Sequence, residues 1–139
     1  MRTAENILQS HKLRRTQSRI QILELFLAGD AALSEPDLER KMNGQCDRVT
    51  IYRTLTSFMD NGVLHKVLDD SGVMKYALCS RECGETHAHH HDHLHFKCEV
   101  CGLTTCVEEI KIPQITLPEG YVQHSINVLV EGRCPKCSV

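Results

Sequence analysis

The chain has 139 residues, is 41% hydrophobic and carries a formal net charge of -2, with eight cysteines and nine histidines. That charge argues against a generally basic nucleic-acid-binding protein, and no apolar run is long enough for a signal peptide or a membrane span. We therefore expect a cytoplasmic protein. In that reducing compartment, cysteines more often serve as metal ligands or redox groups than as a disulfide framework.

Cysteine and histidine are concentrated towards one end of the chain. Residues 1–80 hold only Cys46 and Cys79 and two histidines, whereas residues 81–139 hold the other six cysteines and seven histidines. Small domains without a large apolar core usually need such groups as cross-links. We therefore predict two small parts, with the metal or redox chemistry concentrated in the second.

Three helices are predicted in the N-terminal half, over residues 16–29, 34–44 and 47–62. In each segment apolar residues recur at helical spacing, the first residue is a Thr, Ser or Asp that can cap a helix, and a glycine ends the segment. Ser34 and Asp37 form an S-x-x-D capping pattern at the start of the second helix.

Two alternating segments follow, at 63–68 and 73–78, joined by residues 69–72, which have the composition of a hairpin turn. Three helices and a hairpin predict a winged helix-turn-helix. Such a module places the first turns of its last helix in the major groove of DNA. There Arg can donate hydrogen bonds to guanine, while Ser, Thr and Tyr can reach phosphates.

The candidate DNA-binding surface combines the polar face of the third helix with a basic stretch before the first. No acidic residue lies between Glu5 and Glu24, so this stretch is locally positive despite the net charge of the chain. An ordinary solvated helix face explains the polar residues of the third helix equally well. The candidate DNA contacts are Lys12, Arg14, Arg15, Arg19, Arg48, Thr50, Tyr52 and Arg53.

Two C-x-x-C knuckles lie in the C-terminal half, formed by Cys98 with Cys101 and by Cys134 with Cys137. Four thiolates in this arrangement suit a tetrahedral Zn²⁺ with every coordination position filled, which makes a structural and not a catalytic site. A redox dithiol is the alternative use of either pair. The presence of two knuckles in one short chain favours the zinc site.

A histidine-rich segment precedes the first knuckle. If residues 91–98 form a strand, His91, His93 and His95 project from one face, where two histidines separated by one residue can bind one ion. Alternation with apolar residues favours a ligand role for His93 and His95. Loop residues outside the coordination sphere are expected at His87, His89 and His90.

Together these motifs resemble the ferric uptake regulator (Fur) superfamily over nearly the whole chain. The match comprises R-x-T-x-x-R from Arg14, V-T-I-Y-R-T-L from Val49, H-x-H-x-x-C from His93, and both knuckles, the second preceded by Gly132.

The resemblance implies an α+β fold with a winged-helix DNA-binding domain over residues 1–79, a hinge over 80–90, and a small α/β dimerisation and metal-binding domain over 91–139. It implies a homodimer whose C-terminal halves pair, and a structural zinc on the four knuckle cysteines. It also implies a second metal at the hinge, whose binding closes the two DNA-reading heads onto a palindromic operator.

Several ligand positions of iron-sensing members differ in this chain. Ala32 and Ala77 stand where the iron-type regulatory site has a His and a Glu, and Cys106 replaces a Glu after the first knuckle. A further site on the dimerisation domain lacks ligands at Leu94, Pro113 and Ile126. The chain is therefore most similar to the zinc uptake regulator (Zur) branch of the superfamily.

That branch takes its regulatory ligands from a wing residue, a cysteine just after the second wing strand, and the H-x-H pair. The ligands implied by this resemblance are His65, Cys79, His93 and His95. A thiolate with imidazoles suits Zn²⁺ better than Fe²⁺ or Mn²⁺. Further candidate ligands are Cys83, His91 and Cys106.

The leading hypothesis is a zinc-responsive transcriptional repressor that binds operator DNA as a metal-loaded homodimer and is not an enzyme. The alternative within this class is a regulator of the same superfamily that responds to iron, manganese, nickel or peroxide. A metal-dependent hydrolase is disfavoured, because no H-E-x-x-H-type base accompanies paired ligands. A thiol oxidoreductase is disfavoured, because one structural site uses both C-x-x-C pairs more simply. A metal-storage protein would leave the V-T-I-Y-R-T-L helix unexplained.

Overall fold

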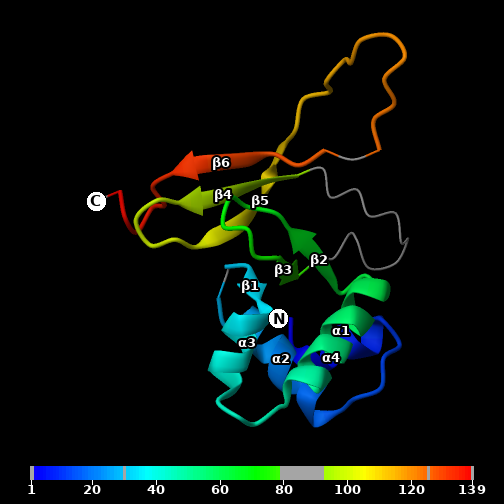
Figure 1. Ribbon diagram of the computed structural model, residues 1–139. Coiled ribbons are helices and arrows are strands. Elements are labelled where there is room, and N and C mark those ends of the chain that lie inside the picture. Colours follow the sequence, from blue (N-terminus) through cyan, green and yellow to red (C-terminus); the bar gives the residue numbers. More distant parts are fainter. Residues whose placement is uncertain (1, 30, 79–92, 125, 139) are drawn as a thin grey trace.

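The computed structural model describes residues 2–29, 31–78, 93–124 and 126–138, and shows a helical part joined to a separate three-stranded sheet (Figure 1). The helical part carries a small antiparallel sheet with strand order β1-β3-β2. Its elements are α1 Ala4–Ser10, α2 Gln17–Leu27, β1 Leu33–Ser34, α3 Glu35–Met42, α4 Arg48–Asp60, β2 Leu64–Val67 and β3 Lys75–Leu78. The three predicted helices and both hairpin strands are confirmed, whereas the short elements α1 and β1 were not expected.

Local capping explains where the predicted helices begin. Thr16 Oγ1 accepts a hydrogen bond from the Arg19 amide at 3.2 Å at the start of α2. At the start of α3, Ser34 Oγ accepts from the Asp37 amide at 3.2 Å and Asp37 Oδ2 accepts from the Ser34 amide at 3.0 Å. This reciprocal pair satisfies amides that the first helical turn leaves without helical partners. Asp47 occupies the N-cap of α4 without a capping side-chain bond.

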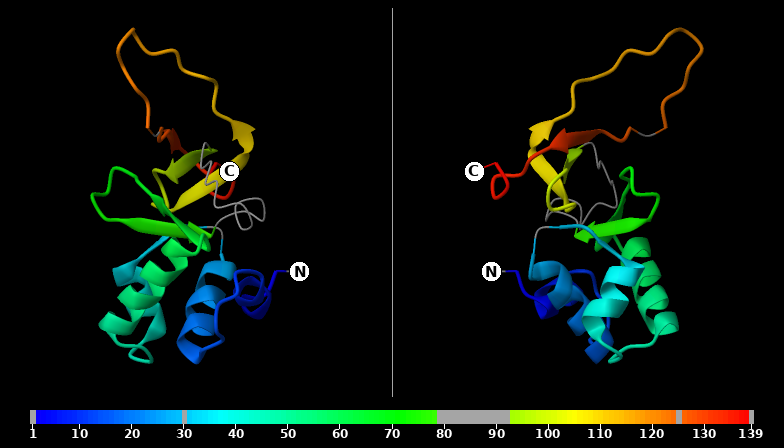
Figure 2. Two further views of the ribbon diagram at one scale, coloured as in Figure 1. Left: turned by 90° about the vertical axis from the view of Figure 1, so that its right-hand side faces the viewer. Right: turned by 60° about the vertical axis from the view of Figure 1, so that its left-hand side comes forward.

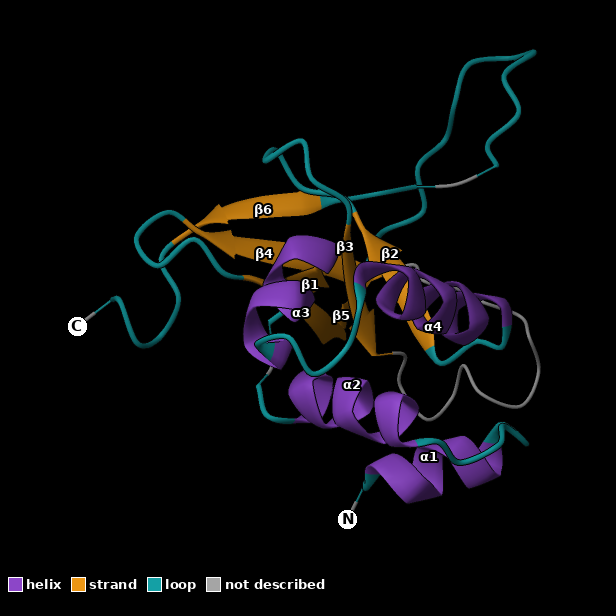
Figure 3. Cartoon of the chain, turned by 60° about the horizontal axis from the view of Figure 1, so that its bottom comes forward, coloured by secondary structure: helices purple, strands orange, loops and turns teal. Residues whose placement is uncertain are grey.

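The apolar core lies where the helices meet the hairpin. Leu23, Leu38 and Phe58, from α2, α3 and α4, have no exposed surface, and Ile7 and Leu8 of α1 pack into the same cluster. The helices lie together in front of the strands in Figure 3. None of the helices in the described ranges is long and apolar enough to cross a membrane.

The second sheet contains β4 His93–Cys98, β5 Thr104–Lys111 and β6 Leu129–Gly132, in the order β5-β4-β6. β5 runs antiparallel to β4, whereas β6 runs parallel to it. Between β5 and β6 the chain extends away from the rest of the molecule over residues 112–124 and 126–128 (Figure 2). The described residues from 93 onwards contain strands and turns but no helix.

The two parts are joined by polar contacts at the turn after β2 and at the start of β5. The Ala32 amide donates to the Thr104 carbonyl oxygen at 2.7 Å. Thr104 Oγ1 donates to Asp69 Oδ2 at 2.8 Å, and Asp70 forms an ion pair with Lys97. These contacts connect the hairpin of the helical part directly to the second sheet.

Asp69 is charged and has no exposed side-chain surface. The Lys75 ammonium lies 2.8 Å from its Oδ2, and the Ser71 amide donates to its Oδ1 at 2.9 Å. Burial opposes ionisation of Asp69, but hydrogen bonds, above all from Lys75 and Ser71, outweigh it and hold the pKa of this carboxyl well below its usual range. The charged carboxylate therefore stabilises the folded chain.

Replacing Asp69 with Asn should lower the free energy of unfolding at pH 7. Because the folded-state pKa lies below the unfolded value of about 3.9, the stabilisation is complete above that pH and is lost as the pH falls through the folded pKa. Urea denaturation should therefore show the deficit of Asp69→Asn shrinking below about pH 4. Asp60→Asn, at the exposed end of α4, is the control and should not lower stability. A deficit that stays constant on acidification would contradict this account.

Candidate metal centres and DNA-binding face

The four knuckle cysteines lie together at one end of the second sheet. Their sulfur atoms are all within 4.8 Å of one another, so the group could hold a metal ion. Strand pairing explains how they meet. The parallel register places Cys98, the last residue of β4, opposite Gly132, two residues before Cys134. Pairing of β4 with β6 therefore brings one knuckle beside the other.

Hydrogen bonding within this group gives its thiols different pKa values. Backbone amides of Cys101 and Cys134 lie 3.5 and 3.4 Å from Cys98 Sγ, and these bonds lower the pKa of Cys98 to about 6. Hydrogen bonds to the neighbouring thiols, first that of Cys134, raise the pKa of Cys137 to about 12. Four thiolates this close repel one another, so full ionisation needs a cation among them. The donor set fits a tetrahedral thiolate site.

A second group lies where the two parts meet. His65 of β2, His95 of β4 and Cys106 of β5 have their potential ligand atoms within 4.8 Å of one another. His65 Nε2 lies 3.3 Å from Cys106 Sγ, and the ring centroids of His65 and His95 are 5.9 Å apart. Each histidine is only 3% exposed. His95 and Cys106 are direct cross-strand partners, so the register of β4 and β5 sets their approach.

The donors of this second group fit a metal of intermediate softness. Two imidazoles and a thiol are the ligand types of many zinc sites. Both histidines are buried, whereas Cys106 is half-buried. Ala32 and Ala77 pack with Val67 and Cys106 beside the group. These alanines stand where iron-sensing members were expected to place ligands, and here they contribute only methyl groups.

The structure describes only some of the predicted regulatory ligands. His65 and His95 come together, and Cys106, expected only as a further candidate, lies close to both and completes a group of three. The one sequence signal for Cys106 was its position in place of a family glutamate. The predicted residues outside the described ranges are Cys79, Cys83, His87, His89, His90 and His91, together with the side chain of His93.

The candidate DNA-binding residues of α4 lie on its outward face. Tyr52 is 59% exposed, Arg53 is also exposed and Thr50 is half-buried. Arg48 forms an ion pair with Glu39 at 3.2 Å, with both side chains largely in solvent. Such surface pairs contribute at most about 1 kcal/mol, so a DNA phosphate can displace the carboxylate.

The basic stretch forms the connection between α1 and α2. Arg15 lies 3.5 Å from Glu5 in an exposed ion pair, and Arg19 donates to the Arg14 carbonyl oxygen at 2.7 Å. Lys12 adopts a left-handed backbone conformation with φ 56°. Arg14 and Arg15 remain exposed. The stretch thus presents cations on the surface. Arg19 also stabilises the connection between α1 and α2 through its hydrogen bond to Arg14.

Comparison with known proteins agrees with this architecture. The model of the ferric uptake regulator family matches residues 10–129. The ferric uptake regulation protein of Staphylococcus epidermidis is 31% identical over 139 residues, covering 96% of this chain and 94% of that protein. The zinc uptake regulation protein of Escherichia coli K12 is 28% identical, with coverage of 96% and 78%.

Solved structures show the same relationship. A zinc uptake regulator complexed with zinc and DNA is 26% identical, with a TM-score of 0.60 and coverage of 96% of this chain and 89% of that chain. The ferric uptake regulator of Pseudomonas aeruginosa with manganese, 19% identical, shares the fold with a TM-score of 0.59, covering 97% and 100% of the two chains. The chain therefore belongs to the ferric uptake regulator family, whose members are metal-responsive transcription regulators and not enzymes.

Proposed function

We propose that the chain is a zinc-responsive transcriptional repressor that binds operator DNA as a metal-loaded homodimer. The group of His65, His95 and Cys106 carries the proposal, because its potential ligand atoms come from both parts of the chain. A metal ion that needs all three ligands has a higher affinity for the orientation in which they converge. Metal would thereby fix how the winged helix is presented to DNA.

The donor chemistry supports zinc as the regulatory metal. A thiolate with two imidazoles is softer than the oxygen-rich sets that Mn²⁺ prefers, and it suits Zn²⁺ well. We propose that Cys79, which directly follows β3, or His93 completes a tetrahedral site. The 26% identical zinc uptake regulator complexed with zinc and DNA supports this reading, whereas the 31% identical ferric uptake regulation protein makes iron the principal alternative.

The four knuckle cysteines, Cys98, Cys101, Cys134 and Cys137, which form the knuckle quartet, are proposed to hold a separate, structural zinc. Its four thiols would fill every position of a tetrahedral ion, which leaves none for water or a reacting group. All four come from the second sheet and its flanking turns. An ion there stabilises that sheet but has no ligand from the winged helix with which to change its orientation.

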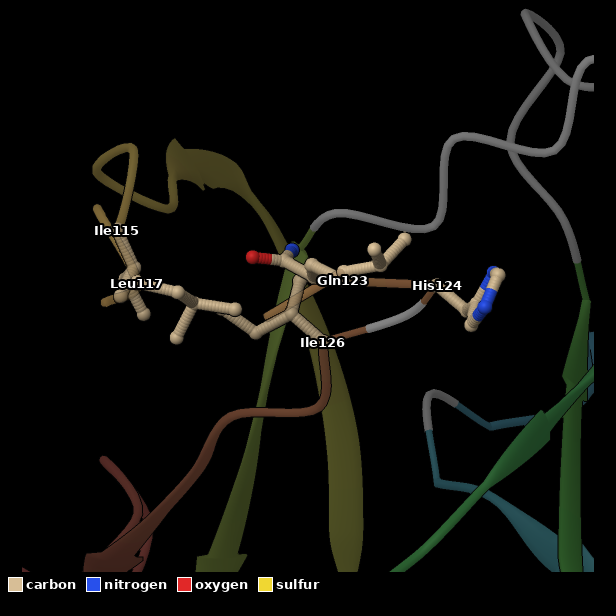
Figure 4. Close-up of a pocket in the computed structure, with 6 residues that line it drawn as sticks. Ile115, Leu117, Gln123, His124 and Ile126 are labelled. Carbon is tan, nitrogen blue, oxygen red and sulfur yellow. The ribbon is translucent and has the colours of Figure 1, made fainter. Parts of the chain in front are cut away.

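The extended segment 112–128 supports the homodimer. Its Ile115, Leu117 and Val122 side chains are 52%, 40% and 76% exposed, and with Ile126 they line an open pocket (Figure 4). Glu119 is the one charged residue in this segment. An apolar surface of this kind favours association with another chain, and pairing of identical surfaces about a twofold axis is the commonest solution. We propose a second copy as the partner.

Cys106→Ala and His95→Ala should each abolish zinc-dependent operator binding while the knuckle zinc remains. Loss of a direct ligand should weaken the affinity of the His65, His95 and Cys106 site, called here the hinge site, for Zn²⁺. The loss should be at least the roughly 10–100-fold caused by mutating residues that only hydrogen-bond to metal ligands. The measurement is operator binding titrated against free Zn²⁺, with parallel titrations of Fe²⁺ and Mn²⁺. Cys46→Ala, a half-buried cysteine in the helical core, is the matched control. A Cys106→Ala protein that responds at wild-type zinc concentrations would exclude this ligand set. A response to Fe²⁺ but not Zn²⁺ would exclude zinc sensing.

Cys101→Ser should remove one zinc per chain and lower the melting temperature of the C-terminal half, because metal binding to the quartet is coupled to the folding of its sheet. Metal analysis and differential scanning calorimetry measure the two effects, and Cys46→Ser is the control. Unchanged zinc content together with an unchanged melting temperature would rule out the structural zinc.

Arg53→Ala should weaken operator binding by roughly 1–3 kcal/mol, the cost of one lost guanine contact, without changing metal content. Tyr52→Phe, which removes one hydroxyl, should have a smaller effect in the same direction. Fluorescence anisotropy with labelled operator at saturating zinc measures the affinity, and Arg133→Ala, beyond β6, controls for loss of positive charge. Wild-type affinity of Arg53→Ala for every DNA tested would remove α4 as the recognition helix.

A further inference from the structure

Thr104 lies at the start of β5, two residues before Cys106. Alternate residues of a strand point to the same face, so Thr104 and Cys106 both face the helical part. Thr104 has no exposed surface. Its hydroxyl donates to Asp69 Oδ2 at 2.8 Å, and its carbonyl oxygen accepts from the Ala32 amide at 2.7 Å. One residue thus contacts two segments of the other part.

The contact of Thr104 with Asp69 runs beside the proposed metal site. His65 meets Cys106 at 3.3 Å, and four residues further along the hairpin Asp69 meets Thr104 at 2.8 Å. The same two segments are therefore joined at two points, one at potential metal ligands and one by a hydrogen bond that needs no metal.

Asp69 is itself held firmly on the helical part. Its Oδ2 also contacts Lys75 Nζ at 2.8 Å, and its Oδ1 accepts from the Ser71 amide at 2.9 Å. The carboxylate therefore has little freedom to follow Thr104 if β5 moves away. A hydrogen bond between a fixed, buried carboxylate and a buried hydroxyl is strong and directional, so it restricts the position of β5.

We propose that Asp69 and Thr104 are positioning residues for the hinge metal site. Their hydrogen bond holds β5 against the hairpin before metal arrives, so that Cys106 already faces His65. A site assembled in advance loses less conformational freedom on binding and has a higher apparent affinity for its ion. This role rests on the proposed function in one respect, that the hinge binds metal. The pair thus sets the zinc concentration at which the regulator responds, while the ligands determine whether it responds.

Thr104→Val tests this role, because valine keeps the shape of threonine and removes the hydroxyl. With the knuckle site filled, competition against a chromophoric chelator should show hinge affinity for Zn²⁺ about tenfold weaker, the size expected for one lost hydrogen bond to a charged group. Thr104→Ser keeps the hydroxyl and should restore affinity. Thr105→Val, one residue along on the opposite face of β5, is the matched control. Operator affinity at saturating zinc should be the same for all four proteins, a separation that general destabilisation would not produce.

A second measurement needs no metal at the hinge. Hydrogen exchange of the Ala32 amide, which donates to the Thr104 carbonyl oxygen, reports whether the parts stay in contact. Exchange in the zinc-free hinge state should be slow in wild type and Thr105→Val and faster in Thr104→Val. If Thr104→Val does not fold, Asp69→Asn should show the same two changes.

The outcomes separate this proposal from the proposed function. Wild-type zinc affinity and wild-type Ala32 exchange in Thr104→Val would overturn the positioning role while leaving zinc sensing intact. Failure of the wild-type hinge to bind any metal would overturn the proposed function and the positioning role together. Weaker zinc binding without rescue by Thr104→Ser would assign the effect to packing and would also overturn the proposal.

Discussion

The meeting of four cysteine sulfur atoms takes the place of an apolar core in the second sheet. Among the described residues from 93 onwards, the buried side chains are His95, Cys98 and Thr104, and none of the three is a hydrocarbon side chain. Burial of so little apolar surface contributes too little free energy to offset the conformational entropy of ordering three strands. The sheet therefore depends on the cysteine group, which could hold a cation, and on the surfaces that it shares with the helical part.

The helical part has the opposite character. Its core of leucine, isoleucine and phenylalanine side chains is continuous from α1 to the hairpin, and it contains neither of the two metal-ligating groups in full. A module with this core keeps its shape whether or not metal is present. In the proposed function, metal acts on the relation between the two parts without reshaping the surface of α4, which is what a switch for DNA binding requires.

Signals that lie close together in sequence made much of the structure predictable. The capping residues Thr16 and Ser34, the turn after β2 and the two C-x-x-C knuckles each act within a few residues, and each could be recognised without knowing what it packs against. The short elements were missed for the converse reason. α1 has only seven residues, and β1 has two, so neither has a periodicity that stands out from its neighbours.

The group of His65, His95 and Cys106 could not be predicted from local sequence signals alone. His65 and Cys106 are separated by 41 residues, and their approach depends on the pairing of β4 with β5 and on the packing of two sheets. No hydrophobic period encodes that approach. Alternation with apolar residues pointed to His95, and the family resemblance supplied His65. The resemblance marked Cys106 only as a departure, and the contact between Thr104 and Asp69 had no sequence signal at all.

The parallel pairing of β4 and β6 has a consequence for how the chain matures. Cys98 and Cys134 are 36 residues apart, and contacts of such separation form slowly compared with the local contacts of helices. The helical part should consequently fold first, and the second sheet should form later, when β4 and β6 pair. During that interval the apolar segment 112–128 is exposed to chaperones, proteases and other unfolded chains. With the proposed structural zinc, the availability of metal during synthesis would influence how many copies fold, so the cellular abundance of the protein would be a second route by which metal supply acts on the proposed regulation.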